Sequence, residues 1–100
     1  MVGKKNLQIS IEAYSAVNAP EWTASVFDRA ELLGLGAFIP APGPAVYDDH
    51  VPFLEQGIAA VDLIDFDYPQ WHTTADTPDR CSQDSLAEVG RLMLDLIYRP

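Results

Sequence analysis

The chain has 100 residues, of which 48% are hydrophobic, and its formal net charge is −9. This length suits one small domain, residues 1–100, and is too short for two. The negative charge argues against nucleic acid and anionic membranes as partners, because phosphate binding depends on Lys and Arg. The sequence has no signal peptide and no apolar run of about eighteen residues, so we expect a soluble chain whose compartment is unknown.

The first half of the chain predicts a strand, a helix and a second strand. Apolar and polar residues alternate over Leu7–Glu12, as in a half-buried strand. Asn18 to Glu21 then predicts a helix start, with a cap residue, an early Pro and an acidic first turn. That helix is expected to end at Gly34 or Gly36. Ala37–Ile39 predicts a short strand, and Pro40–Pro44 a turn-rich loop.

The second half predicts a short helix, a buried strand and a long final helix. Val51–Gln56 is expected to be helical and to end at Gly57. Ile58–Ile64 is an almost continuous apolar run, which is typical of a central parallel strand. Ser82 is a plausible N-cap of the last helix, and an apolar stripe with helical spacing follows it. The order predicts an α/β fold in which helices flank a mostly parallel sheet. The stripe consists of Leu86, Val89, Leu92, Met93, Leu96 and Ile97.

Acidic residues and both histidines gather around the predicted Ile58–Ile64 strand. Nine of the fifteen acidic residues lie between Asp48 and Asp84, which indicates either a solvated rim or a cation-binding pocket. Imidazole together with carboxylates is a ligand set that suits zinc. The two loops that flank the strand could converge at one edge of a parallel sheet. Their candidate residues are Asp48, Asp49 and His50 before the strand, and Asp65, Asp67, Trp71, His72 and Asp76 after it.

Each of these candidates also has a purely structural interpretation. His72 could be a hydrogen-bonded histidine where a loop meets the core, and His50 could simply cap or pair at a helix start. Asp76 could be an ordinary turn residue that bonds to its own backbone. Trp71 could be loop packing. On residue types alone, these structural interpretations are favoured for both histidines.

The spacing of these residues resembles the carboxyl-terminal part of the zinc-dependent aminopeptidases, a family that shares its fold with glutaminyl cyclases. The resemblance rests on Asp49-His50, Phe53, Gly57-Ile58 and the stretch His72-Thr73-x-x-Asp76-Thr77. It covers nearly the whole chain. It implies a partial, truncated zinc-exopeptidase fold.

The resemblance also implies roles for individual residues. His72 matches the histidine that ligates zinc near the end of family chains. Asp49, His50 and Asp76 match residues that are expected to contact and orient the zinc ligands, or, for Asp76, to hold the loop after the ligand. Asp48 stands where many aminopeptidases have Ser and where cyclase-like members have Asp in a hydrogen-bond network near the catalytic acid. Trp71 resembles the indole that shapes the substrate pocket in that same branch.

Other parts of the family pattern are missing from this chain. The remaining zinc ligands and the catalytic Glu belong to segments that would precede Met1, and the chain is expected to start just after a ligand Asp. One histidine cannot hold catalytic zinc, which needs about three protein ligands. We therefore expect zinc in the parent enzyme and no tightly bound zinc in this chain alone.

Three functional hypotheses follow. The first is a fragment of a zinc exopeptidase that hydrolyses peptides from the amino terminus with a zinc-activated water, the fragment alone being inactive. The second is a fragment of a glutaminyl cyclase-like aminoacyltransferase, which Asp48 and Trp71 favour, whereas the general pattern of the family favours the peptidase, the function we expect first. The third is a stand-alone, non-catalytic α/β binding module. In the first two a peptide is the substrate, and unpaired sheet edges could lead to self-association.

Overall fold

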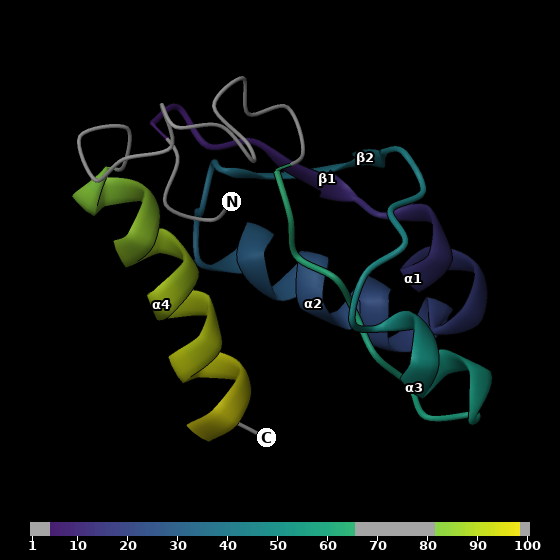
Figure 1. The fold of residues 1–100 in the computed structure, drawn as a ribbon. Helices are drawn as coiled ribbons and strands as arrows, with labels where there is room; N and C mark the ends of the chain where they lie inside the picture. Colours follow the sequence, from purple (N-terminus) through teal and green to yellow (C-terminus); the bar gives the residue numbers. More distant parts are fainter. Residues whose placement is uncertain (1–4, 66–81, 99–100) are drawn as a thin grey trace.

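The computed structural model describes residues 5–65 and 82–98 (Figure 1). Its first half is a strand–helix–helix–strand unit. The strands β1 (Ile9–Ile11) and β2 (Phe38–Pro42) pair in parallel, and α1 (Ala13–Asn18) and α2 (Pro20–Leu32) connect them. This order confirms the predicted α/β architecture with a parallel sheet and flanking helices.

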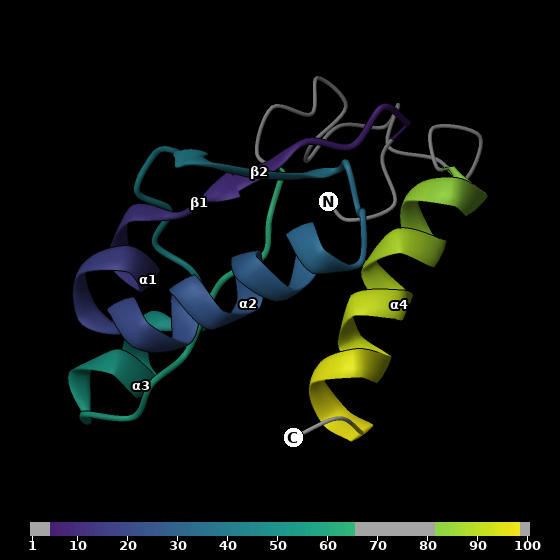
Figure 2. The same cartoon turned by 180° about the vertical axis from the view of Figure 1, so that it is seen from behind.

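The second half adds two helices to the strand pair. α3 (Val51–Glu55) is short, and α4 (Gln83–Tyr98) is the longest helix of the described residues. In both views the strand pair lies above α2, and α4 lies to one side of them (Figures 1 and 2). The helix α2 thus lies beneath the two strands, and α4 packs beside it.

Local sequence explains where the helices begin and end. Pro20 occupies the first turn of α2, where its missing N–H has no partner to lose, and Glu21 lies at the positive helix end. Gly34 and Gly57 follow α2 and α3 with φ of 71° and 76°, a left-handed conformation that glycine adopts without steric cost. In α4, the backbone N–H of Ser85 donates to Ser82 Oγ at 3.4 Å, in agreement with the predicted cap.

The hydrophobic core lies between the strand pair, α2 and α4. The rings of Phe27 and Phe38 meet edge to face with centroids 6.1 Å apart. Leu92 contributes the buried side of α4 and has no exposed surface. Arg29 of α2 pairs with Asp95 of α4 beside this contact. The core residues are Leu7, Ile9, Val26, Phe27, Ala30, Leu35, Ala37, Phe38 and Leu92.

Two predictions of local structure are wrong. A separate helix, α1, precedes α2, because the Glu12 carboxylate accepts the N–H groups of Tyr14 and Ser15 and so caps a helix start that the alternating pattern concealed. Pro40, which was assigned to a loop, lies within β2.

The predicted Ile58–Ile64 strand is also not formed. No residue of this segment lies in a strand, and hydrogen bonds link it and the adjoining Asp65 to the rest of the chain. The N–H of Asp62 donates to Ser15 Oγ at 2.9 Å, and Asp65 Oδ2 accepts from the N–H of Gln8 at 3.0 Å. Val61 and Leu63 are partly buried against the core, but Ile58 is 54% exposed, so the predicted burial on both faces holds only in part.

Candidate functional site

Glu12 is the centre of a buried polar cluster at the end of β1. Glu12 is only 2% exposed, and both of its carboxylate oxygens accept hydrogen bonds. Oε2 accepts from the N–H groups of Tyr14 at 2.7 Å and Val46 at 2.9 Å. Oε1 accepts from the N–H and the hydroxyl of Ser15 at 2.9 and 2.8 Å. Burial alone would raise the pKa of Glu12, but these hydrogen bonds outweigh it and hold the pKa below its ordinary value.

His50 faces Glu12 from the turn that precedes α3. Its Nε2 lies 2.6 Å from Glu12 Oε1, and its side chain is 5% exposed. On the other side of the ring, Nδ1 lies 3.7 Å from Asp62 Oδ2. Within the described structure, neither Nδ1 nor Oδ2 has a hydrogen-bond partner, although both atoms are buried. A buried polar atom without a partner is uncommon in folded proteins, so Nδ1 and Oδ2 each lack the hydrogen bond or other ligand that buried polar atoms usually have.

Asp62 closes the cluster from the segment after α3. Its N–H reaches Ser15 Oγ, which in turn donates to Glu12, so backbone and side chain both join the network. Burial raises the pKa of Asp62 to about 6, the negative charge of Asp48 adds to the rise, and His50 opposes it. A carboxyl group with this pKa can hold or release a proton near neutral pH.

Together, Glu12, His50 and Asp62 form a compact set of potential metal ligands. One ligand atom from each residue lies within 4.8 Å of the others. Imidazole and carboxylate donors suit zinc and related transition metals, whereas Mg²⁺ and Ca²⁺ prefer oxygen ligands alone. The same atoms can instead share protons, so the cluster supports either proton transfer or cation binding.

The structure brings one predicted site residue into this cluster and places two others beside it. His50 is buried at its centre. Asp48 is half-buried, its Oδ1 accepts the N–H of Asp49 at 2.8 Å, and its charge acts on Asp62. Asp49 itself is exposed. Their proposed roles stay predictions. Trp71, His72 and Asp76 lie outside the described residues.

Glu12 and Asp62 were not predicted as site residues. The alternating pattern predicts Glu12 only as the polar end of a strand. The apolar run contains Asp62 as a single carboxylate among Val61, Leu63 and Ile64, and this is a signal for a buried polar site. A charged residue is rarely buried unless it is paired, so its position alone favoured a partner.

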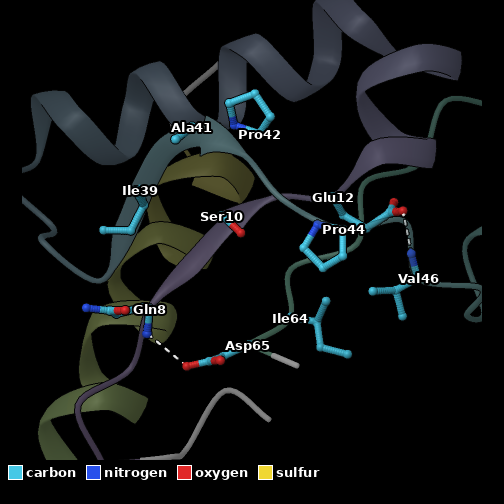
Figure 3. A pocket seen from close by; sticks show the side chains of 10 residues that line it. All are labelled: Gln8, Ser10, Glu12, Ile39, Ala41, Pro42, Pro44, Val46, Ile64 and Asp65. Carbon is cyan, nitrogen blue, oxygen red and sulfur yellow. Dashed lines mark hydrogen bonds between the residues drawn. The ribbon is translucent and has the colours of Figure 1, made fainter. Parts of the chain in front are cut away.

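A cavity of about 350 Å³ lies between the strand pair and the segment that ends at Asp65 (Figure 3). Glu12 and Asp65 form its polar ends, and Ile39, Val46 and Ile64 supply much of its apolar lining. Ser10 points toward it from β1 (Figure 3). Glu12 therefore borders both this cavity and the buried cluster.

Comparison with known proteins places this geometry in a family. The model of peptidase family M28 matches residues 1–97. A solved structure described as a leucine aminopeptidase precursor from Bacteroides thetaiotaomicron aligns with a TM-score of 0.92 and 34% identity. The alignment covers all of this chain and 36% of that one. A glutaminyl cyclase from Porphyromonas gingivalis aligns with a TM-score of 0.92 and 32% identity, over 98% of this chain and 39% of that one.

A mouse protein gives the same indication from sequence. The glutaminyl-peptide cyclotransferase-like protein of Mus musculus is 40% identical over 53 residues, which are 52% of this chain and 14% of that protein. The chain thus spans a small part of the curated relative and little more than a third of the solved structures. No helix among the described residues is long and apolar enough to cross a membrane.

Proposed function

This chain belongs to peptidase family M28, and from that premise we propose that it is the carboxyl-terminal portion of a zinc-dependent enzyme acting on the amino-terminal residue of peptides. Its relatives support both a zinc exopeptidase and a glutaminyl cyclase. In this proposal His72 is the zinc ligand that the chain supplies. Zinc, when bound, supplies a Lewis acid that polarises the carbonyl under attack.

Among the activities of the family, we favour cyclisation of amino-terminal glutamine. The observation that carries this choice is Asp48, a half-buried carboxylate whose charge acts on Asp62. In the resemblance, aspartate at this position marks the cyclase-like branch, and many aminopeptidases have serine there. Curated relatives from mouse and cattle are both named cyclotransferases, which supports the same choice.

The chemistry of cyclisation gives Asp48 a defined task. The α-amine of the substrate attacks its own γ-amide carbonyl, a new C–N bond forms, and the bond to the amide nitrogen breaks to release ammonia. A proton must therefore pass from the attacking amine to the leaving nitrogen. A carboxylate in a partly buried acidic group is suited to support that transfer. Trp71 is proposed to pack against the substrate side chain.

The second candidate function is hydrolysis of the amino-terminal peptide bond. The alignment with the leucine aminopeptidase precursor, at 34% identity, supports it. In this case water, rather than the substrate amine, attacks the carbonyl. Asp48 would then have no proton to transfer within the substrate.

Purified complete protein that contains this chain distinguishes the two functions. It is assayed with peptides that begin with glutamine and with aminoacyl anilides, and His72→Ala serves as the metal-ligand variant. We expect release of ammonia from the glutamine peptides, little hydrolysis of the anilides, and loss of activity in His72→Ala. Anilide hydrolysis without cyclisation would favour the peptidase, and full activity of His72→Ala would contradict the zinc role.

A further inference from the structure

In the buried ring of His50, one nitrogen has a hydrogen-bond partner and the other has none. Nε2 lies 2.6 Å from Glu12 Oε1. Because a carboxylate only accepts hydrogen bonds, the neutral ring must carry its proton on Nε2, which leaves a lone pair on Nδ1. Nδ1 lies 3.7 Å from Asp62 Oδ2, which is also an acceptor when ionised. Two buried acceptors therefore face each other with no donor between them.

The negative charges around the ring also favour a positive group beside it. Glu12 and Asp62 contact His50 from two sides, and the charge of Asp48 also acts on Asp62. In the described part of the chain, the ion pairs of these carboxylates involve His50 and no Lys or Arg. Burying uncompensated carboxylates is costly. A positive group between Nδ1 and Oδ2 would meet both requirements.

We propose that His50 Nδ1 and Asp62 Oδ2 bind a divalent transition-metal ion of the zinc class, with Glu12 holding the imidazole from behind. Zinc bonds to histidine nitrogen and carboxylate oxygen of about 2.0–2.2 Å span the 3.7 Å separation with an angle at the metal of about 115–135°. Histidine ligands commonly donate their other N–H to a carboxylate, which fixes the ring and its tautomer. Glu12 occupies that place.

This site uses none of the residues assigned to the proposed catalytic zinc. Its ligands come from the turn before α3 and from the segment after it, and Glu12 comes from the end of β1. Bound metal would link three separate parts of the chain. The ion would therefore stabilise the fold, and loss of the ion would be detected in thermal stability even without an activity assay.

The test counts zinc in the complete protein that contains this chain, in a His72→Ala background that removes the proposed catalytic ligand. After removal of metal with a chelator, zinc chloride is titrated by calorimetry. We expect one binding event that Asp62→Asn abolishes and that Glu12→Gln weakens by about 10- to 100-fold. Asp28→Asn, the same change at an exposed position of α2, should bind as the parent does. Unchanged zinc binding in Asp62→Asn would overturn the proposal.

A second measurement avoids any substitution within the cluster. In ¹⁵N-labelled His72→Ala protein, zinc should shift the Nδ1 resonance of His50 and leave Nε2 protonated. Zinc should also raise the melting temperature. If zinc leaves the Nδ1 resonance in place, a proton rather than a metal satisfies the ring, and the proposal is wrong. Loss of peptide cyclisation in His72→Ala together with retained zinc binding would separate this site from the catalytic one.

Discussion

The Nε2 atom of His50 lies 2.6 Å from Oε1 of Glu12, and this buried contact joins two parts of the chain that are 38 residues apart. Glu12 also caps α1 and accepts the backbone N–H of Val46. One carboxylate therefore fixes the start of a helix, the loop before α3 and the orientation of the imidazole. The candidate site is built into the fold rather than added to its surface.

Glu12→Gln should destabilise the protein by about 2–4 kcal/mol, since an amide nitrogen would face backbone donors and bonds to an ionised acceptor would be lost. Glu21→Gln, at an exposed position of α2, should cost less than about 0.5 kcal/mol apart from a small helix-end effect. Urea unfolding measures both. Equal stabilities for the two variants would show that the Glu12 network contributes little.

Asp62 and Glu12 should make stability depend on pH in opposite directions. The folded state binds the Asp62 proton more tightly than the unfolded chain, so metal-free protein gains stability as pH falls through about 6. The pKa of Glu12 is lowered from 4.5, so its stabilisation is present above that value and is lost as pH falls through the lower folded pKa. Melting temperatures in chelator should therefore pass through a maximum.

Two variants show which residue causes each slope of the melting temperature against pH. Asp62→Asn should flatten the rise as pH falls from about 6 toward 3.8, and Glu12→Gln should flatten the fall below 4.5. A profile that Asp62→Asn leaves unchanged would show that the raised pKa of Asp62 does not contribute to stability.

Leu92→Ala should cost about 2–5 kcal/mol, because the side chain is fully buried where α4 meets the core. Leu94→Ala, two residues along the same helix and 60% exposed, makes the same chemical change at a position facing away. It should change stability by less than about 0.5 kcal/mol. Thermal unfolding compares them, and similar losses would mean that α4 packs through a different face.

Gly43→Ala should destabilise the strand pair beside the cavity. An added Cβ would clash with Ser10 Oγ and lie 3.2 Å from the carbonyl oxygen of Ile11, so the Ser10 side chain would have to rotate and β1 to give by a few tenths of an ångström. We expect a loss of about 1–3 kcal/mol by overpacking. Gly36→Ala is the control, since nothing lies within 4 Å of its added Cβ. A Gly43→Ala protein as stable as Gly36→Ala would contradict the close approach.

Local patterns predicted the helices better than the pairing of strands. Pro20, Gly34 and Gly57 act on their own neighbours, so the bounds of α2 and α3 could be anticipated. Pairing of Ile58–Ile64 depends on which distant backbone lies beside it, and the apolar pattern carries no such information. The pattern predicted burial that Val61 and Leu63 reach in part and that the exposed Ile58 does not.

The candidate site was predictable only in part for the same reason. His50 stood out because histidine and aspartate are adjacent in sequence. Glu12 and Asp62 lie 50 residues apart, and their meeting depends on the path of the chain after α3. Asp62 carried a local signal, a lone carboxylate in an apolar run, whereas Glu12 in an alternating strand carried none.

The most direct test of the proposed function is the rate of pyroglutamyl-peptide formation by the complete protein and its Asp48→Asn variant. We predict that the unmodified protein converts an amino-terminal glutamine peptide to its cyclic product with release of ammonia. Asp48→Asn should lower kcat by about 100-fold or more, the scale of one general acid–base group, while Asp28→Asn should leave it unchanged. Hydrolysis of aminoacyl anilides at the same rate in both proteins, with no cyclic product from either, would contradict the account.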